Sequence, residues 1–476
     1  TKNPAASGSV SYHTMNSYFG RVFYSYADKY MITANIRWDG SSNFADKHRW
    51  GVFPSVSGGW NFREESFIKD VVGDWFSQGK FRAAWGEIGY QGNMLSNQTP
   101  NMIIRQETDY TGKYGEFHSK VAHYPNPDLR WETTRQLDFG LDLAFFNSAL
   151  KFNIDYFDRK TSDMLVQVPM PAAIGLPNTP WSNAGSVKNR GFEFVLDYHG
   201  KIGNDFSYNI AGNISTYKNK VLSLGGGTNI PGKTHLGNQV NTMIEPGKPI
   251  GYFYGYKMDG VFQTQEEINN YRGGPDNTII MPTAEPGDLK FVDLNGDGKL
   301  GEEDRTMIGN PHPDFTFGLT LSGEYKGFDL SMFFQGSVGN DILKILKYDI
   351  YSGTGWYNAP KDIFDKFWTG PGSTNENFAI SANSRDNLTM SEWYIENGSY
   401  VRLKNVTLGY TFPKQWVQKL TVQNLRLFVA AQNLFTITSY SGLDPELGNS
   451  NPAFMGIDMG WYPQARSFMV GLSLKL

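Results

Sequence analysis

The chain has 476 residues, no cysteine and a formal net charge of −4, which excludes disulfides and thiolate metal sites and offers no basic surface for nucleic acid. Aromatic residues make up 15% and charged residues 19% of the chain. The first share is high and the second low for a soluble protein, and the aromatic excess is typical of the girdles of outer-membrane barrels. Because no run of about 18 apolar residues occurs, the sequence predicts no transmembrane helix.

Apolar and polar residues alternate with a period of two from one end of the chain to the other. Between residues 30 and 39 the apolar positions are even and the polar ones largely odd. Alternation recurs over 313–325, where the apolar positions are odd, and over 466–476, where they are even. Successive strand residues point to opposite faces, so each segment has one apolar and one polar face. The apolar face could meet a second sheet in a soluble sandwich, or lipid in an outer-membrane barrel.

On this criterion the sequence predicts about thirteen strands. They are expected near 18–27, 30–39, 52–61, 80–88, 133–146, 149–158, 187–199, 206–217, 313–325, 328–337, 400–412, 424–434 and 466–476.

The connections between these strands alternate in length. Short turns are expected at 27–29, 146–148, 200–205 and 325–327, and long polar loops at 40–51, 89–130, 159–186, 219–312, 338–398 and 435–465. Short turns at one end and long loops at the other are typical of an outer-membrane barrel, whose short turns face the periplasm. A sandwich does not explain such long loops on one side only. Two longer links on the short-turn side, 62–79 and 413–423, are predicted to form small amphipathic caps.

The strand count also carries information, because single-chain bacterial barrels have even numbers of strands. An odd count predicts that residues 1–476 are the C-terminal portion of a larger antiparallel transmembrane β-barrel, with the N-terminal plug and the first strands absent. An open sheet edge within lipid would not be viable. One strand breaks its alternation, since Val401 and Leu403 are apolar at odd positions and Val406 and Leu408 at even ones. This indicates a β-bulge near 404–405, or a strand whose upper part has left the membrane.

The sharpest local motif lies in the 219–312 loop. Oxygen donors fall at positions 1, 3, 5 and 12 of a calcium-type loop, glycine stands at position 6, and position 7 offers a backbone carbonyl. The predicted metal residues are Asp293, Asn295, Asp297, Lys299 and Asp304. We expect one structural Ca²⁺ that stiffens this extracellular loop insertion. The alternative is an Asn/Asp/Gly turn that hydrogen-bonds to itself.

The long loops are rich in aromatic residues, which can stack on sugars or enter a protein interface. Possible ligand or partner contacts are Trp181, Trp356, Tyr357, Trp393, Trp461 and Tyr462. The alternative for each is an aromatic girdle or packing within the loops. The stretch 251–262 is predicted to form a small hairpin. No nucleophile elbow occurs and the seven histidines lack metal-ligand spacing, so the sequence predicts no enzyme.

Several segments resemble one family in order along the chain. They are ANIRWDGSSNF at 34–44, NPDLRWETT at 126–134, GDLKFVDLNGDG at 287–298, DRTMIGNP at 304–311 and RLKNVTLGY at 402–410. The chain is similar in these segments to the barrel of SusC-like (SusC/RagA) TonB-dependent transporters. It departs from the family at its end, where Leu476 stands in place of the usual aromatic residue.

The resemblance implies an all-β fold, the C-terminal portion of a 22-stranded barrel of the plugged transporter type with long extracellular loops. It implies an outer-membrane nutrient importer that takes up oligosaccharides or peptides together with a SusD-like surface lipoprotein lid. Energy would come from the TonB complex through the missing N-terminal region. The competing hypothesis is a soluble, secreted, calcium-stabilised β-sandwich that binds glycans.

Overall fold

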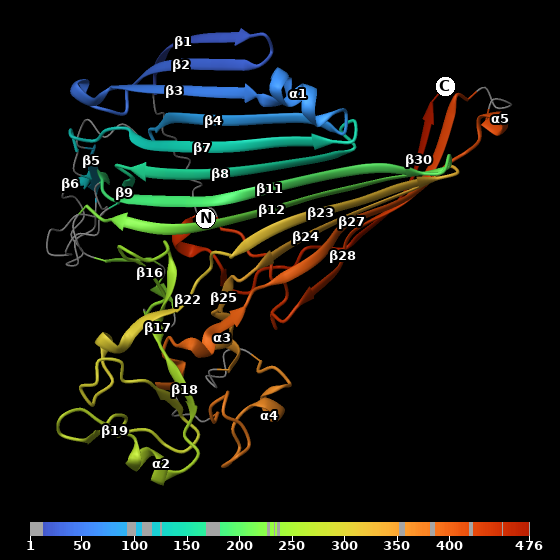
Figure 1. Cartoon of the computed structure of the whole chain (residues 1–476). Helices are drawn as coiled ribbons and strands as arrows, with labels where there is room; N and C mark the ends of the chain where they lie inside the picture. Colours follow the sequence, from blue (N-terminus) through green and yellow to red (C-terminus); the bar gives the residue numbers. More distant parts are fainter. Residues whose placement is uncertain are drawn as a thin grey trace, which may run out of the picture. The chain divides into compact units, whose positions relative to one another are not determined.

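A computed structural model describes most residues of the chain (Figure 1). These are 13–92, 101–106, 117–123, 126–167, 181–225, 229–232, 234–235, 239–351, 358–380, 386–417, 422–449 and 451–475. The chain divides into two compact units. Unit 1 consists of residues 1–148, 153–191 and 220–228, and unit 2 of 149–152, 192–219 and 229–476.

The largest sheet of the described chain has 13 strands, each hydrogen-bonded to the next wall strand in the sequence. In order they are β1 (Met15–Tyr26), β2 (Tyr30–Ser41), β3 (Trp50–Asn61), β4 (Phe76–Tyr90), β7 (Glu132–Phe145), β8 (Leu150–Ser162), β11 (Ser186–Ile202), β12 (Phe206–Ser223), β23 (Phe315–Tyr325), β24 (Phe328–Val338), β27 (Tyr400–Thr411), β28 (Asn424–Thr438) and β30 (Ser467–Lys475). The thirteen predicted strands are confirmed, with ends that shift by a few residues.

The alternation sorts the side chains of β2 onto two faces. Ile36 is 51% exposed and faces the same way as its register partners Gly20 and Pro54. The polar residues between, such as Asn35, are less exposed because they contact neighbours on the other face. The exposed face of β2 is therefore the apolar one, the inverse of a soluble sheet.

The short turns are tight because their residues adopt left-handed backbone conformations. Ala27 and Asp28 have φ of 52° and 54° between β1 and β2, and Lys326 and Gly327 have φ of 46° and 89° between β23 and β24. Such angles reverse a chain within two residues. Both predicted caps contain helices, α1 (Ser66–Val72) and α5 (Lys414–Val417).

The predicted β-bulge is present where the alternation of β27 changes. The register with β28 shifts between Leu403 and Asn405, and the register with β24 shifts between Phe333 and Phe334. The extra residue turns the apolar positions of β27 from odd to even numbers.

The long loops contain short elements of their own. The strands are β5 (Asn101–Gln106), β6 (Phe117–His123), β9 (Leu165–Gln167), β10 (Trp181–Asn183), β13 (Ile230–Pro231), β14 (Thr234–His235), β15 (Gln239–Val240), β16 (Thr242–Ile244), β17 (Tyr252–Tyr256), β18 (Met258–Val261), β19 (Arg272–Gly273), β20 (Thr278–Ile279), β21 (Leu289–Phe291), β22 (Arg305–Gly309), β25 (Asp341–Lys344), β26 (Ile395–Asn397) and β29 (Ile457–Asp458). The helices are α2 (Gln265–Asn270), α3 (Leu346–Tyr351) and α4 (Ile363–Lys366).

The hairpin predicted over 251–262 is wrong. The strand β17 pairs with β16 and β22, and β18 pairs with β21. Tyr252 and Phe253 point to opposite sides of β17 and both are almost fully buried. A strand buried on both faces lies inside a larger assembly, so it takes neighbours from distant parts of the loop instead of folding back on itself.

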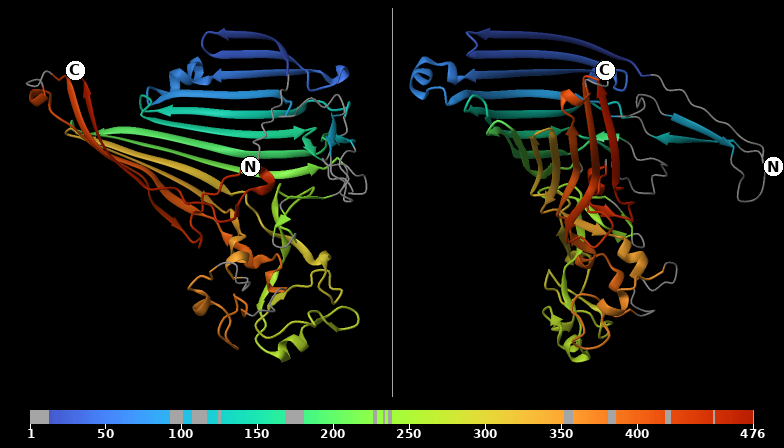
Figure 2. Two further views of the ribbon diagram at one scale, coloured as in Figure 1. Left: turned by 180° about the vertical axis from the view of Figure 1, so that it is seen from behind. Right: turned by 90° about the vertical axis from the view of Figure 1, so that its right-hand side faces the viewer.

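Two loops that are far apart in the sequence share one small sheet in unit 2. Its order is β26-β25-β29, and β25 pairs with β29 in parallel, Leu343 opposite Ile457. Seen from two further sides, the yellow-green and orange loop segments of unit 2 gather in one body (Figure 2). In the described part of the chain, none of the helices has the length and apolar character needed to cross a membrane.

Candidate functional site

The polar face of the unit 1 sheet carries a network of paired charges. The guanidinium of Arg82 donates two hydrogen bonds of 2.8 Å to Asp142 and one of 2.8 Å to Asp155, and Asn153 donates to Asp142 at 2.7 Å. Arg82 on β4 reaches Asp155 on β8 by passing over Gly140 of β7, where a Cβ would lie 2.5 Å from both side chains. The network fixes a hydrophilic wall with no unpaired reactive group among its members.

A hollow of about 570 Å³ opens on this polar face of unit 1. Its lining combines amide, hydroxyl, guanidinium and carboxylate groups with aromatic rings: Asn35, Arg37, Asp39, Ser55, Glu87, Gln91, Phe53, Tyr90 and Trp131. The Nε of Arg37 donates to Asp39 at 2.7 Å, so these two opposite charges are already paired. The volume is within the range of small-molecule sites, and the lining suits a polar ligand with flat or apolar faces.

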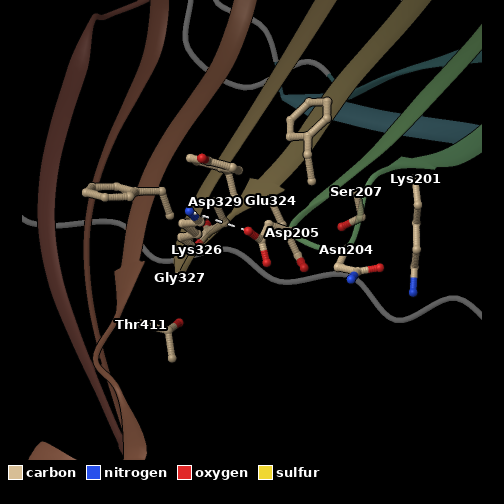
Figure 3. A pocket seen from close by; sticks show the side chains of 12 residues that line it. Lys201, Asn204, Asp205, Ser207, Glu324, Lys326, Gly327, Asp329 and Thr411 are labelled. Atoms are coloured by element: carbon tan, nitrogen blue, oxygen red, sulfur yellow. Dashed lines mark ion pairs between the residues drawn. The ribbon is translucent and has the colours of Figure 1, made fainter.

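Another hollow, of about 420 Å³, lies in unit 2 at the short-turn end (Figure 3). Lys326 forms an ion pair of 3.4 Å with Asp205, and Lys201 stands apart near the end of β11. Glu324 and Asp329 also line it. Cations and anions are mixed and widely exposed here, so the chemistry favours no particular ligand.

The long loops of unit 2 form a body with its own hydrophobic core, which we call the loop module. Its buried members include Phe253, Phe291, Leu343, Phe378 and Trp393. These residues come from β17, β21, β25 and the segment that follows α4, so four distant stretches of chain meet in one core. Such a core gives the loops a defined shape.

A buried charge cluster joins three segments of this loop module. Lys347 of α3 lies 3.0 Å from Glu396 of β26 and donates to the carbonyl of Trp393 at 2.7 Å. Lys344 of β25 donates to the hydroxyl of Ser441 at 2.6 Å. Burial would raise the pKa of Glu396, but Lys347, Ser441 and Lys344 outweigh it and lower that pKa. Burial lowers the pKa of Lys347 despite its carboxylate partner.

A second charge cluster holds the last long loop against the wall. Arg402 on β27 is buried, and it donates to Asp444 at 2.5 Å and to Glu446 at 2.7 Å. Lys404 reaches the same Glu446 at 2.8 Å. Burial would raise the pKa of Asp444, but hydrogen bonds from Arg402 and from the backbone N–H groups of Gln464 and Glu446 lower it. The loop is thereby tied to the strand by several hydrogen-bonded charges.

The residues of the calcium-type loop lie together, as the spacing predicts. Asp293 accepts from the N–H groups of Gly296 and Gly298 at 2.7 and 2.8 Å, and Asp304 accepts from Leu294, Asn295 and Gly301. Asp297 accepts from Lys299 at 2.9 Å. In the described chain no group of three or more His, Cys, Asp or Glu side chains is arranged to hold a metal. These contacts are those of the self-bonded turn, and calcium stays a prediction.

The six predicted aromatic contacts differ in their surroundings. Trp393 is 5% exposed in the core of the loop module, so its side chain serves packing and offers no surface to a partner. Trp181 is half-buried beside the core of Phe44 and Trp131. Trp461 and Tyr462 are exposed. Trp356 and Tyr357 lie outside the described residues.

Sequence reasoning missed the charge networks of the polar face. Their signal is present in the pattern, since Arg82 and Asp142 occupy polar positions of strands that are consecutive in the sheet. What the pattern lacked was the register between strands, which decides whether two such residues are opposite each other.

Comparison with known proteins identifies a family that has this architecture. Residues 1–434 match the family described as "TonB dependent receptor-like, beta-barrel". The chain is 35% identical over 478 residues to the TonB-dependent receptor P3 of Formosa agariphila, covering 96% of this chain and 45% of that protein. It is 30% identical over 472 residues to the TonB-dependent receptor SusC of Bacteroides thetaiotaomicron, covering 97% and 44%.

Among solved structures, the fold is similar to that of the RagAB peptide transporter. The TM-score is 0.79 at 23% identity, over 97% of this chain and 48% of that one. The chain thus spans less than half the length of the curated relatives it matches. Three observations indicate an outer-membrane barrel: the exposed apolar face of the sheet, the alternation of short and long connections, and the family match. The hypothesis of a soluble sandwich is therefore excluded. The chain belongs to the TonB-dependent receptor-like β-barrel family, whose members are outer-membrane barrels.

Proposed function

We propose that this chain is the barrel portion of a nutrient importer that takes up oligosaccharides or peptides with energy from the TonB complex. The observation that carries the proposal is the fixed polar wall with its mixed hollow on the face opposite the lipid-facing one. A transport path needs polar groups that bind a solute weakly and leave no reactive group to change it. The same features support a carrier and not an enzyme.

The chemistry of the hollow bears on the substrate class. The exposed Tyr90 offers a ring face, and Asn35 and Gln91 offer amides that can both donate and accept. Sugar rings and peptide backbones are the two solute classes that use both kinds of contact. The relative RagAB is described as a peptide transporter, which keeps the peptide class in the proposal beside oligosaccharides.

We also propose a SusD-like surface lipoprotein as the lid of this barrel. The loop module has a core of its own and buried charge clusters, so it can carry a second protein without rearranging. Trp461 and Tyr462 stay exposed on the loop after β29 and are of the residue types enriched in interface cores. A permanent complex of this kind would bury more than about 2,000 Å².

One experiment tests transport and its solute class together. Cells that carry or lack the intact protein are given labelled oligosaccharides and labelled peptides separately, and uptake is measured with and without an uncoupler that removes the TonB energy supply. Energy-dependent uptake of one class that is lost with the protein supports the proposal. Equal uptake by both strains for every solute, or chemical breakdown of the solute by the purified protein, contradicts it.

We further propose that the 219–312 loop binds one Ca²⁺ as a structural ion. Asp293, Asn295, Asp297, the carbonyl of Lys299 and Asp304 supply hard oxygen donors in calcium-loop order. Each carboxylate oxygen of Asp293 and Asp297 accepts one hydrogen bond and so retains a lone pair that a cation could use. Calcium titration followed by calorimetry on the intact protein, with Asp297→Ala as the comparison, tests it.

A further inference from the structure

The cap that connects β3 to β4 in unit 1 combines a rigid attachment with an exposed apolar surface. We call residues 62–75, which contain α1, the α1 cap. Figure 1 shows α1 beside the end of β3 and the beginning of β4, at the short-turn end of these strands. In outer-membrane barrels the short turns face the periplasm, so the α1 cap lies on the periplasmic side.

Two buried charged side chains attach the α1 cap to the strands. Arg63 is 8% exposed and donates to the carbonyls of Phe76 and Gly73, which fixes both ends of the segment around α1. Glu65 is 9% exposed and accepts from the hydroxyl of Tyr30, from the indole of Trp60 at 3.1 Å and from Lys29 at 3.2 Å. These hydrogen bonds, together with the charge of Lys29, lower the pKa of Glu65. The carboxylate therefore stays ionised and holds the cap in one position.

The same rigid cap presents its largest apolar side chains to the outside. Phe67 is 65% exposed, Val71 81% and Trp75 54%. Phe67 and Val71 lie four residues apart, on one side of α1, while Lys69 lies on the other side. A cap that existed only to close a turn would not need ordered, exposed apolar residues at this spacing.

This apolar surface is continuous with the lipid-facing side of the strands. Trp75 stacks on Phe145 with ring centroids 5.8 Å apart and an interplanar angle of 13°. Phe145 follows Phe139 and Leu141 at alternate positions of β7, on the face where Phe139 stacks with Phe81. That face meets lipid in this family of barrels, so Trp75 extends the lipid-facing surface into the cap.

We propose that the α1 cap is an interfacial anchor that inserts Phe67, Val71 and Trp75 into the periplasmic leaflet of the outer membrane. The occupant of this surface is the boundary between phospholipid headgroups and acyl chains, which amphipathic helices enter to a depth of about 5–10 Å. Lys69 on the opposite side pairs with Glu64 at 2.9 Å and points to water.

The charges near the cap specify how it binds lipid. Asp70 and Asp74 are exposed, and Lys69 is already paired with Glu64. The cap therefore has no surplus of positive charge to attract anionic lipids. Apolar insertion drives the contact, which should be insensitive to salt and present with zwitterionic phospholipids.

The cap of unit 2 offers an independent case of the same arrangement. In α5, Val417 is buried against its unit while the neighbouring Trp416 is 61% exposed. Here too a short-turn-side link anchors one apolar residue and presents an aromatic ring outward. Tryptophan is enriched at membrane–water interfaces because its ring is amphipathic.

The test uses single-cysteine variants of the intact protein in phospholipid bilayers. Residues 1–476 contain no cysteine, and any cysteine elsewhere in the protein is first replaced by serine. Phe67→Cys and Val71→Cys are labelled with a small fluorophore, and Lys69→Cys is the matched control on the opposite side of α1. Brominated phosphatidylcholine quenches only labels that contact acyl chains. We expect loss of most of the emission at 67 and 71, little loss at 69, and no change on adding salt.

Two outcomes would overturn the proposal. In the first, brominated lipid leaves all three labels equally bright while a water-soluble quencher reaches each of them. In the second, the labels at 67 and 71 are shielded from both quenchers, which would assign the surface to a protein partner. Heat-dependent gel mobility of each variant checks that the barrel is folded, and Val71→Cys, the smaller change, carries the test if Phe67→Cys does not fold.

Discussion

Asp329 and Arg426 lie on strands that do not pair with each other, and their side chains meet across Gly409 of the strand between them. The Nε of Arg426 donates to Asp329 at 2.8 Å, from β28 to β24, across β27 near its C-terminal end. A Cβ at position 409 would lie 2.5 Å from both side chains. Glycine is therefore the residue that lets the ion pair span three strands.

Replacing Gly409 by alanine should force this ion pair apart. We expect a loss of about 1–3 kcal/mol in the free energy of unfolding, the usual cost of inserting atoms into a packed site. Denaturant unfolding in lipid or detergent measures it. The control is Gly212→Ala, whose added Cβ would meet its nearest atoms at 3.7 Å. Equal stability of the two variants would contradict the role assigned to Gly409.

Charge on the apolar face of the sheet should be more costly than charge on the polar face. Leu319 belongs to the apolar face and Thr320 to the polar one. Leu319→Arg should destabilise the folded barrel by about 2–4 kcal/mol if the site is near the bilayer midplane, because the guanidinium would enter lipid. Thr320→Arg should cost far less. The pair Ile154→Arg and Asn153→Arg repeats the comparison in β8, and folding titrations into lipid vesicles measure both.

The calcium proposal predicts a cation-dependent loop. Adding Ca²⁺ should raise the midpoint of thermal unfolding of the loops and slow protease cleavage within 219–312, since the ion would bind only the folded loop. Asp297→Ala should abolish both effects and weaken docking of the lid. If calcium and chelator give identical cleavage rates in the unchanged protein, the motif is only the hydrogen-bonded turn.

Substitutions of Trp393 and Tyr462 should distinguish an aromatic residue that packs in a core from one that contacts a partner. Trp393→Ala empties part of the core of the loop module and should cost about 3–5 kcal/mol of its stability, seen as faster limited proteolysis. Tyr462 is 89% exposed, so Tyr462→Ala should change stability by less than about 0.5 kcal/mol. It should instead reduce copurification of the lipoprotein. Unchanged copurification with Tyr462→Ala would remove this residue from the proposed interface.

Acid should loosen the loop module through Glu396. Its pKa is lowered in the folded protein, so its stabilising effect is present above the pKa of the unfolded chain and is lost as the pH falls through the folded value. Protonation would leave Lys344 and Lys347 without their shared carboxylate. Protease sensitivity of the loops should therefore rise at acidic pH, below the ordinary carboxylate range. Glu396→Gln should be sensitive already at neutral pH and show a smaller change with acid.

The 13-stranded sheet could be predicted from the sequence because each of its strands is recognisable from its own alternation of apolar and polar residues. The alternation in β2 specifies a strand, its two faces and its length without reference to any other part of the chain. The change of parity around Lys404 even placed the bulge of β27. Turns such as 326–327 are set by residues that tolerate left-handed conformations.

The loop module could not be predicted in the same way. Its strands are two to five residues long, and β25 finds its parallel neighbour β29 more than a hundred residues later. Nothing in the local pattern distinguishes Trp393, which is buried, from Trp461, which is exposed. The hairpin predicted over 251–262 was wrong for the same reason. The strand β17 is buried on both faces, and tertiary packing decides which strands it pairs with.

The sheet β26-β25-β29 has a consequence for how such proteins can diversify. Because residues 338–398 and 435–465 contribute strands to the same sheet, neither loop has a complete structure without the other. A graft that moves one of them from a relative would bring half of a sheet and leave an unmatched edge. Successful chimaeras should therefore exchange the two segments as a pair, and natural changes in one should be accompanied by changes in the other.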